Sequence, residues 1–331
     1  MMTLKRSISL ILLSTLTVFS CKPDHPLDKK EAVNNIRALD SEIIGLAEQI
    51  SETPAVRALE FLKNQSSSPL PFKNDTSARL SGHPPYSFAV KKGVYQWDTI
   101  TGSFVKQKDT TVILLHFPLI DRPKSACRFL LSDYQTRDTK SRPGFPVSAE
   151  AKLFIDGHEE LTVSHHAVLS ENMLSAIITD AHAGDFDLHF HLARTGDFSQ
   201  QSGILKGDLK IQEGKKEIIN MEFKIDIDYH PPVAYSVRYI RFLMTVFETE
   251  LKADINYGAI NPTSGHYADE FNSNSKIFLK NLENRGIIGN IVLSLNTGKD
   301  KLDYFIRFSD GTESLLSDQF IILKKLIHLK Y

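Results

Sequence analysis

The sequence predicts an α+β fold: N-terminal helices, then a large antiparallel β-meander sheet with C-terminal helices packed on it. Three observations predict this order. Apolar residues recur every three or four positions between residues 33 and 62, which is the spacing of a helix with one buried stripe. From residue 93 to residue 229 the apolar spacing becomes two, and turn residues interrupt it at short intervals. Beyond Pro231 and Pro232 the helical spacing returns.

The chain begins with the features of a cleavable export signal over residues 1–20. Lys5 and Arg6 precede an apolar run that is too short to cross a bilayer as a stable span. The signal ends in the letters VFS before Cys21, and this order resembles a bacterial lipobox, in which the signal is cut before the cysteine and the cysteine carries lipid. The resemblance implies lipidation at Cys21 and a lipidated tether over residues 21–27.

A lipidated Cys21 predicts a protein that is held at the cell envelope by a durable membrane anchor. A diacyl or triacyl group buries more methylene groups than one myristoyl chain, at about 0.8 kcal/mol each. Lys22 stands where an aspartate would resemble an inner-membrane retention signal, so the outer membrane of a Gram-negative bacterium is the expected location. The alternatives are an ordinary secretory signal that is cut nearby and an apolar segment that stays as the anchor.

Charge and cysteine content exclude several classes of protein. The 331 residues contain 39 Lys and Arg against 40 Asp and Glu, and no basic block occurs, so nucleic acid is not an expected partner. Cys21 and Cys127 are the two cysteines. A lipidated Cys21 leaves Cys127 without a disulfide partner, so the fold must be stabilised by packing. We expect Cys127 to be a small buried apolar residue in a strand.

The first folded element is a helical segment over residues 28–64. Asp28 and Glu31 have the spacing of a capping box at a helix N-terminus. Thr53 and Pro54 predict a second helix start, with threonine as N-cap and proline at the first helical position. These helices are expected to pack on the sheet or to form a stalk. Residues 65–85 are rich in Ser, Pro, Asn and Lys and predict a linker.

An antiparallel β-rich domain is predicted over residues 86–331. Residues 111–119 are apolar on both faces, which is typical of a central strand. Residues 151–229 give the clearest meander, and Asp156-Gly157 is a strong type I′ hairpin signal within it. Strict alternation over 185–192 predicts that one face of this sheet packs and the other is wet.

Three helices are predicted in the C-terminal part of this domain, at about 235–257, 273–285 and 318–330, with strands over 287–295 and 303–308. The first has apolar residues at helical spacing and ends in Asn-Tyr-Gly, which favours a glycine cap. The last is expected to pack on the sheet, with a position on the membrane surface as the alternative.

Four segments carry a resemblance to a known group of proteins. They read GVYQWDTITGSFVKQ, TTVILLHFP, AKLFIDGHEELTVSHHA and YFIRFSDGTESLL. Together with the meander they resemble β-rich envelope lipoproteins of Bacteroidota that have no assigned activity, over most of residues 85–320. The shared features are hairpin patterns, so the resemblance implies a lipoprotein of unknown function and assigns no functional residue.

Histidine is the one unusual chemical resource of the meander. Asp187, His189 and His191 alternate along one strand and therefore share a face. With a ligand from a neighbouring strand, this row could hold a metal such as zinc, which indicates a metal-binding protein or a metal-dependent enzyme. A pH-responsive patch is a softer version of the same hypothesis. The competing interpretation is that these are ordinary polar residues on a solvated face.

The sequence contains none of the catalytic signatures G-x-S-x-G, P-loop or dinucleotide fingerprint, so no catalytic residue is assigned. The leading hypothesis is a lipid-anchored envelope protein without enzymatic activity or a required cofactor, which binds an unidentified small molecule or protein or has a structural role. The first alternative is the metal site described above. The second is a carrier in which the meander curls around a lipid or another hydrophobic ligand. The sequence leaves enzymatic activity open, but the lack of a catalytic signature favours a protein that is not an enzyme.

Overall fold

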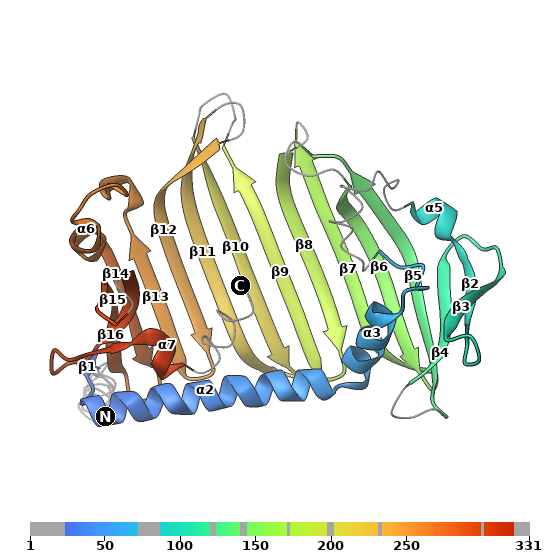
Figure 1. The fold of residues 1–331 in the computed structure, drawn as a ribbon, viewed down its shortest axis with the longest axis horizontal. Coiled ribbons are helices and arrows are strands. Elements are labelled where there is room, and N and C mark those ends of the chain that lie inside the picture. The colour runs from blue at the N-terminus through green and yellow to red at the C-terminus, as the bar shows by residue number, and fades with distance from the viewer. Residues whose placement is uncertain are drawn as a thin grey trace, which may run out of the picture.

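The computed structural model describes residues 24–71, 87–119, 124–139, 144–170, 173–196, 202–230, 234–298 and 301–320. Cys21, most of the predicted linker and the predicted helix beyond Phe320 lie outside these residues. Within them the chain forms a large, mostly antiparallel sheet with a few helices (Figure 1). None of the described helices combines the length and apolar character needed to cross a membrane.

The helices are α2 (Lys29–Glu52), α3 (Pro54–Asn64), α5 (Phe88–Lys91), α6 (Tyr267–Asn274) and α7 (Leu316–Gln319), with a 3-10 turn η2 (Tyr257–Ala259). The strands are β1 (His25–Pro26), β2 (Gly93–Asp98), β3 (Ser103–Lys108), β4 (Ile113–Pro118), β5 (Ala126–Arg137), β6 (Phe145–Ile155), β7 (His158–Ser170), β8 (Met173–Ala183), β9 (Phe186–Thr195), β10 (Ser202–Glu213), β11 (Lys216–His230), β12 (Ala234–Val246), β13 (Thr249–Ile255), β14 (Ser275–Asn281), β15 (Gly286–Asn296), β16 (Lys301–Arg307) and β17 (Glu313–Leu315).

Every strand from β4 to β16 pairs antiparallel with the next strand in the chain. The β2–β3 hairpin joins this meander through a parallel pairing of β2 with β4, and β1 pairs in parallel with β15. The predicted turn at Asp156-Gly157 is confirmed, since both residues have positive φ angles, 52° and 87°. The predicted meander over residues 151–229 corresponds to β6 to β11.

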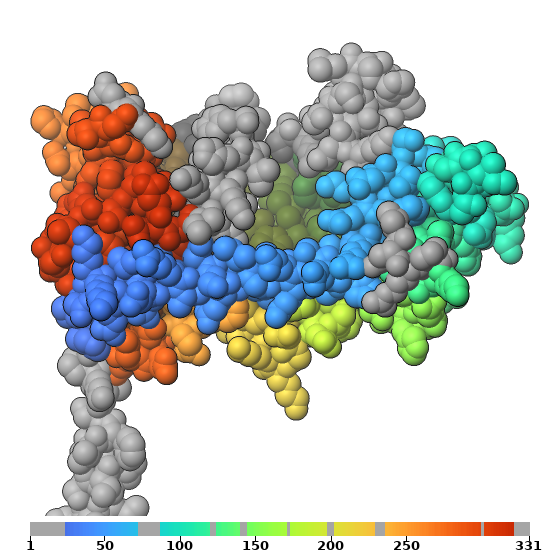
Figure 2. Space-filling view, turned by 60° about the horizontal axis from the view of Figure 1, so that its bottom comes forward, coloured from blue at the N-terminus to red at the C-terminus, as the bar shows by residue number. Residues whose placement is uncertain are grey.

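Helix α2 runs across the strand ends on one side of the sheet, from near β14–β17 to α3 (Figures 1 and 2). Both predicted helix starts are confirmed. The Asp28 carboxylate accepts a hydrogen bond of 2.9 Å from the Glu31 amide, and the Thr53 hydroxyl accepts one of 3.3 Å from the Val56 amide. Each bond satisfies an amide of the first helical turn that has no partner within the helix.

Three apolar clusters hold the sheet to its helices. The first joins α3 to β2–β8, the second joins α2 and α7 to β11–β16, and the third joins α6 and η2 to β12–β15. The first contains Phe61, Leu153 and Cys127, so Cys127 is buried in a strand as predicted. Strands β9 and β10 contribute no residue to the three clusters. The centre of the sheet therefore lies between two cores, the first cluster on one side and the second and third clusters on the other. Helix α2 packs in the second cluster and leads into α3 in the first, so it connects the two cores.

The predicted helix at 235–257 is wrong. The chain forms β12 and β13 there, with Phe247 and Glu248 as the turn between them. Apolar residues at 240, 242, 244 and 246 alternate along β12 and share one face, so period two prevails over the helical spacing seen in the sequence. The segment predicted as a glycine cap is the 3-10 turn η2, which follows a strand.

The other two predicted C-terminal helices have different outcomes. The helix predicted at 273–285 is wrong in position: α6 ends at Asn274, and β14 occupies 275–281, where it pairs with β13 and β15. Pairing with two neighbours satisfies the β14 backbone and overrides local preference. Of the helix predicted at 318–330, the described part is the end of α7, which spans Leu316–Gln319.

Replacing Asp28 with alanine should lower the free energy of unfolding by about 1 kcal/mol, because the Glu31 amide loses its hydrogen-bond acceptor. Urea unfolding of the purified protein measures the change. Asp28→Asn is the matched control, since asparagine caps helices about as well. Equal losses in both variants would show that the side chain stabilises the helix by charge and not by capping.

Acid pH should destabilise the fold partly through His116 on β4. Burial lowers the pKa of His116, and the charge of Arg128, directly opposite on β5, lowers it further. Because the folded pKa lies below the unfolded value of 6.5, the stabilisation is fully present above about pH 6.5 and is lost as pH falls below it. His116→Gln should reduce the change in the free energy of unfolding between pH 7.5 and 5, measured by urea unfolding at each pH. His158→Gln, at an exposed position, is the control and should leave this change as it is in the native protein.

Candidate functional site

The two faces of the central strands β8–β13 differ in chemistry. In register across these strands, Thr179, Phe190, Leu209, Met221, Met244 and Leu251 share one face, which we call the apolar face. The adjacent row of Asp180, His189, Lys210, Asn220, Thr245 and Glu250 lies on the opposite face, which we call the polar face. Helices α2, α3, α6 and α7 pack on the apolar side. The described helices thus leave the polar face uncovered.

Asp187, His189 and His191 share the polar face, as the sequence predicts. Each of them contacts a neighbouring strand or turn partner. The Nδ1 atom of His191 lies 3.2 Å from an oxygen of Asp208 on β10. The Asp187 carboxylate lies 2.8 Å from Nδ1 of His182 on β8.

His189 lies between two carboxylates. Its Nδ1 atom is 2.5 Å from Asp180 on β8, and its Nε2 atom is 3.6 Å from Asp208 on β10. The histidines and acids therefore form a continuous ladder of cross-strand pairs over β8, β9 and β10. Sequence reasoning missed Asp180 and Asp208, because only strand register places them beside the histidines.

Among the described residues, no group of three or more His, Cys, Asp or Glu side chains is arranged to hold a metal ion. The imidazoles of His189 and His191 each turn toward a carboxylate on another strand. Each of these contacts is made by the Nδ1 atom of the ring. The three predicted residues do share one face of the sheet, and the partners of its two histidines are acids.

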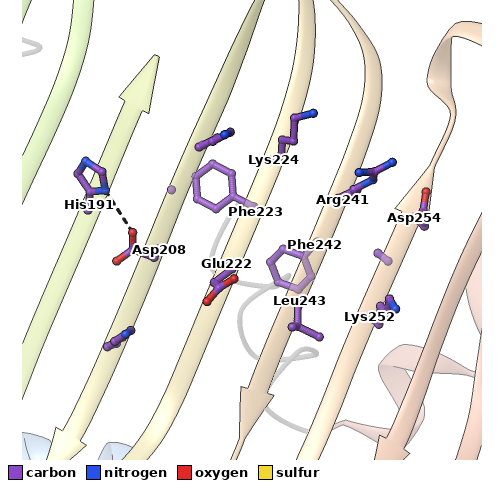
Figure 3. A pocket seen from close by; sticks show the side chains of 14 residues that line it. His191, Asp208, Glu222, Phe223, Lys224, Arg241, Phe242, Leu243, Lys252 and Asp254 are labelled. Carbon is purple, nitrogen blue, oxygen red and sulfur yellow. Dashed lines mark hydrogen bonds and ion pairs between the residues drawn. The ribbon is translucent and has the colours of Figure 1, made fainter. Parts of the chain in front are cut away.

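A groove of about 610 Å³ opens on the polar face across β9 to β13 (Figure 3). Its lining residues are His191, Lys206, Gly207, Asp208, Lys210, Glu222, Phe223, Lys224, Arg241, Phe242, Leu243, Lys252, Ala253 and Asp254. It holds five permanent cations and three carboxylates. Leu243, 38% exposed, is a large apolar side chain on its polar-face wall.

A second groove of about 360 Å³ lies beside the first and includes Asp180, His182, Asp187 and His189 in its wall. It reaches from β6 to β10. The histidine–acid ladder lies at the border of the two grooves and contributes residues to both. Both grooves are lined mainly by residues of the polar face.

Comparison of the chain with protein-family models, curated proteins and solved structures gives no match. The chemistry of the polar face therefore carries the functional argument by itself. Of the other predicted site residues, Cys21 lies outside the described part of the chain.

Proposed function

We propose that the protein is a lipid-anchored, non-enzymatic binding protein of the cell envelope, and that the polar face of its central sheet is the binding surface. The observation that carries the second part is the groove across five neighbouring strands on a face that the described helices leave uncovered. A sheet supplies a rigid and extended platform for such a surface, because every strand fixes the position of its neighbours.

The arrangement of charges favours binding over catalysis. Asp208 is shared by two histidines, Glu222 lies directly opposite it on β11, and Asp254 lies on β13. A general acid or base needs a positioned partner and a reacting group within hydrogen-bond reach. No nucleophile of the serine or cysteine type lines the larger groove.

The membrane part of the proposal rests on the sequence that ends at Cys21. Protein extracted from envelopes in detergent should yield an N-terminal peptide that begins at Cys21 and carries the mass of two or three acyl chains. Cys21→Ala should abolish acylation, whereas the matched variant Cys127→Ala should keep it. An unmodified peptide, or one that begins elsewhere, would contradict the anchor.

The non-enzymatic part is tested with the full-length protein on a panel of ester, glycoside and peptide substrates. We expect no turnover above that of buffer. Turnover that disappears in Asp187→Asn, His189→Gln or Asp208→Asn would overturn this part, because it would show that the histidine–acid ladder performs chemistry.

A further inference from the structure

Three cations lie directly opposite one another on the polar face. Strand register pairs Lys206 on β10 with Lys224 on β11, and Lys224 with Arg241 on β12. The row, which we call the cation row, ends at Ala193 on β9 and at Asp254 on β13. Neighbouring strands lie about 4.8 Å apart, so the outer two cations are separated by roughly 10 Å at their backbones.

Such a row costs stability, because like charges directly opposite each other on neighbouring strands repel. The fold compensates for it only in part. Lys224 has an acidic neighbour on its own strand, with Nζ 3.3 Å from Asp226, and Arg241 stacks on the Tyr239 ring at 5.1 Å. Lys206 makes no ion pair with any described residue. A row of cations that the fold neutralises only in part has the character of a binding site for anions.

The row lies in the larger groove, next to carboxylates of a second row. Asp208, Glu222 and Leu243 follow the three cations at the next same-face position of each strand, and Lys252 continues this second row. Carboxylates accept hydrogen bonds from hydroxyl groups, while lysine and arginine bind carboxylate or sulfate groups. Cations beside carboxylates therefore suit a chain that carries both anionic groups and hydroxyls.

The same features disfavour other polyanions. Nucleic-acid binding is dominated by contacts between cations and phosphates, whereas this groove also presents three carboxylates, which suit the many hydroxyl groups of a polysaccharide. A single strand would also need aromatic rings on which its bases could stack, but Phe223 and Phe242 alternate with the cation-row residues and belong to the apolar face. From these observations we infer that the groove binds an acidic polysaccharide along the cation row. This inference rests on the proposed function, since it names the ligand class of the same surface.

The test uses the full-length protein in detergent and three probes: dextran sulfate, polygalacturonate and neutral dextran. Binding is measured by titration calorimetry at two salt concentrations. We expect both charged polymers to bind, more weakly at high salt, and neutral dextran not to bind. The triple variant Lys206→Gln, Lys224→Gln, Arg241→Gln should weaken binding at least about tenfold. The control triple Lys30→Gln, Lys63→Gln, Lys108→Gln, at exposed positions outside the groove, should change it less than about twofold.

Thermal unfolding separates loss of binding from loss of fold. The cation-row triple should melt at the same temperature as the native protein or higher, because it removes repulsion between opposite strands. A lower melting temperature with unchanged binding would overturn the inference, as it would assign the row a structural role. Binding of duplex DNA as tight as that of the polysaccharides at equal salt would overturn the ligand class.

Two outcomes distinguish this inference from the proposed function. Neutral dextran that binds as well as the charged polymers, and is lost in Leu243→Trp but not in the cation-row triple, would overturn the acidic class and leave the binding surface standing. Absence of binding to both charged polymers would overturn the inference alone, since a lysine acetylation footprint tests the surface without any chosen ligand.

Discussion

Replacing Ile36 with alanine is expected to lower the free energy of unfolding by about 2–5 kcal/mol. Ile36 is fully buried in the cluster that joins α2 to the C-terminal strands, where its neighbours include Leu279, Ile288 and Ile306. The substitution removes three carbon atoms from a packed site. The folded protein then loses the favourable free energy of burying them, and the residues around the resulting cavity lose van der Waals contacts. Urea or thermal unfolding followed by circular dichroism measures the loss.

Ile100→Ala is the matched control for this prediction. The same side chain is 93% exposed in the β2–β3 turn, so its removal should change stability by less than about 0.5 kcal/mol. Similar losses for Ile36→Ala and Ile100→Ala would show that α2 does not pack on the sheet. Such a result would favour the stalk that the sequence leaves open and would remove the helix that connects the two cores.

Replacing Gly207 with alanine is expected to destabilise the protein by about 1–3 kcal/mol, because the added methyl group has no free space at the centre of the sheet. A methyl group there would lie 2.9 Å from the carbonyl oxygen of His191 and would meet the Phe223 ring still more closely. Since the carbonyl belongs to the paired strand β9, the backbone itself would have to move. The same variant should also disturb the groove, because Gly207 forms part of its lining.

Gly45→Ala provides a control with the opposite expected sign. Gly45 lies within α2, and a methyl group added there has no atom within 4 Å. Alanine should therefore stabilise the helix by about 0.5–1 kcal/mol, because it restricts the unfolded chain and favours the helix. Equal effects of the two substitutions would contradict the tight contact between β9, β10 and the Phe223 ring.

The N-terminal helices and most strands could be predicted because their signals are local. Capping residues define the starts of α2 and α3, and Asp156-Gly157 marks its hairpin. The segment at 235–257 lacks such a signal. Phe247 occupies a positive φ of 51° in the turn between β12 and β13, where glycine or asparagine is the usual residue. Without that marker, apolar residues at positions that fit both periods favour a helix in the sequence.

The candidate site could be predicted only within one strand. Alternation places His189 and His191 on the same face, which needs no knowledge of neighbouring strands. The partners Asp180 and Asp208, and the alignment of Lys206 with Lys224 and Arg241, depend on the register of separate strands. Register is fixed by the packing of the whole sheet, so local sequence does not specify which charges lie side by side.

Binding of a ligand to the polar face in the envelope can be measured with a lysine acetylation footprint, which needs no chosen ligand. Acetylation rates are measured by mass spectrometry for Lys206, Lys210 and Lys252 in isolated envelopes and in the purified protein, with Lys63 and Lys108 as exposed references. We predict that the three groove lysines are labelled more slowly in envelopes, while the reference lysines are unchanged. Equal protection of groove and reference lysines, or none at either, would contradict the assignment of the polar face as the binding surface.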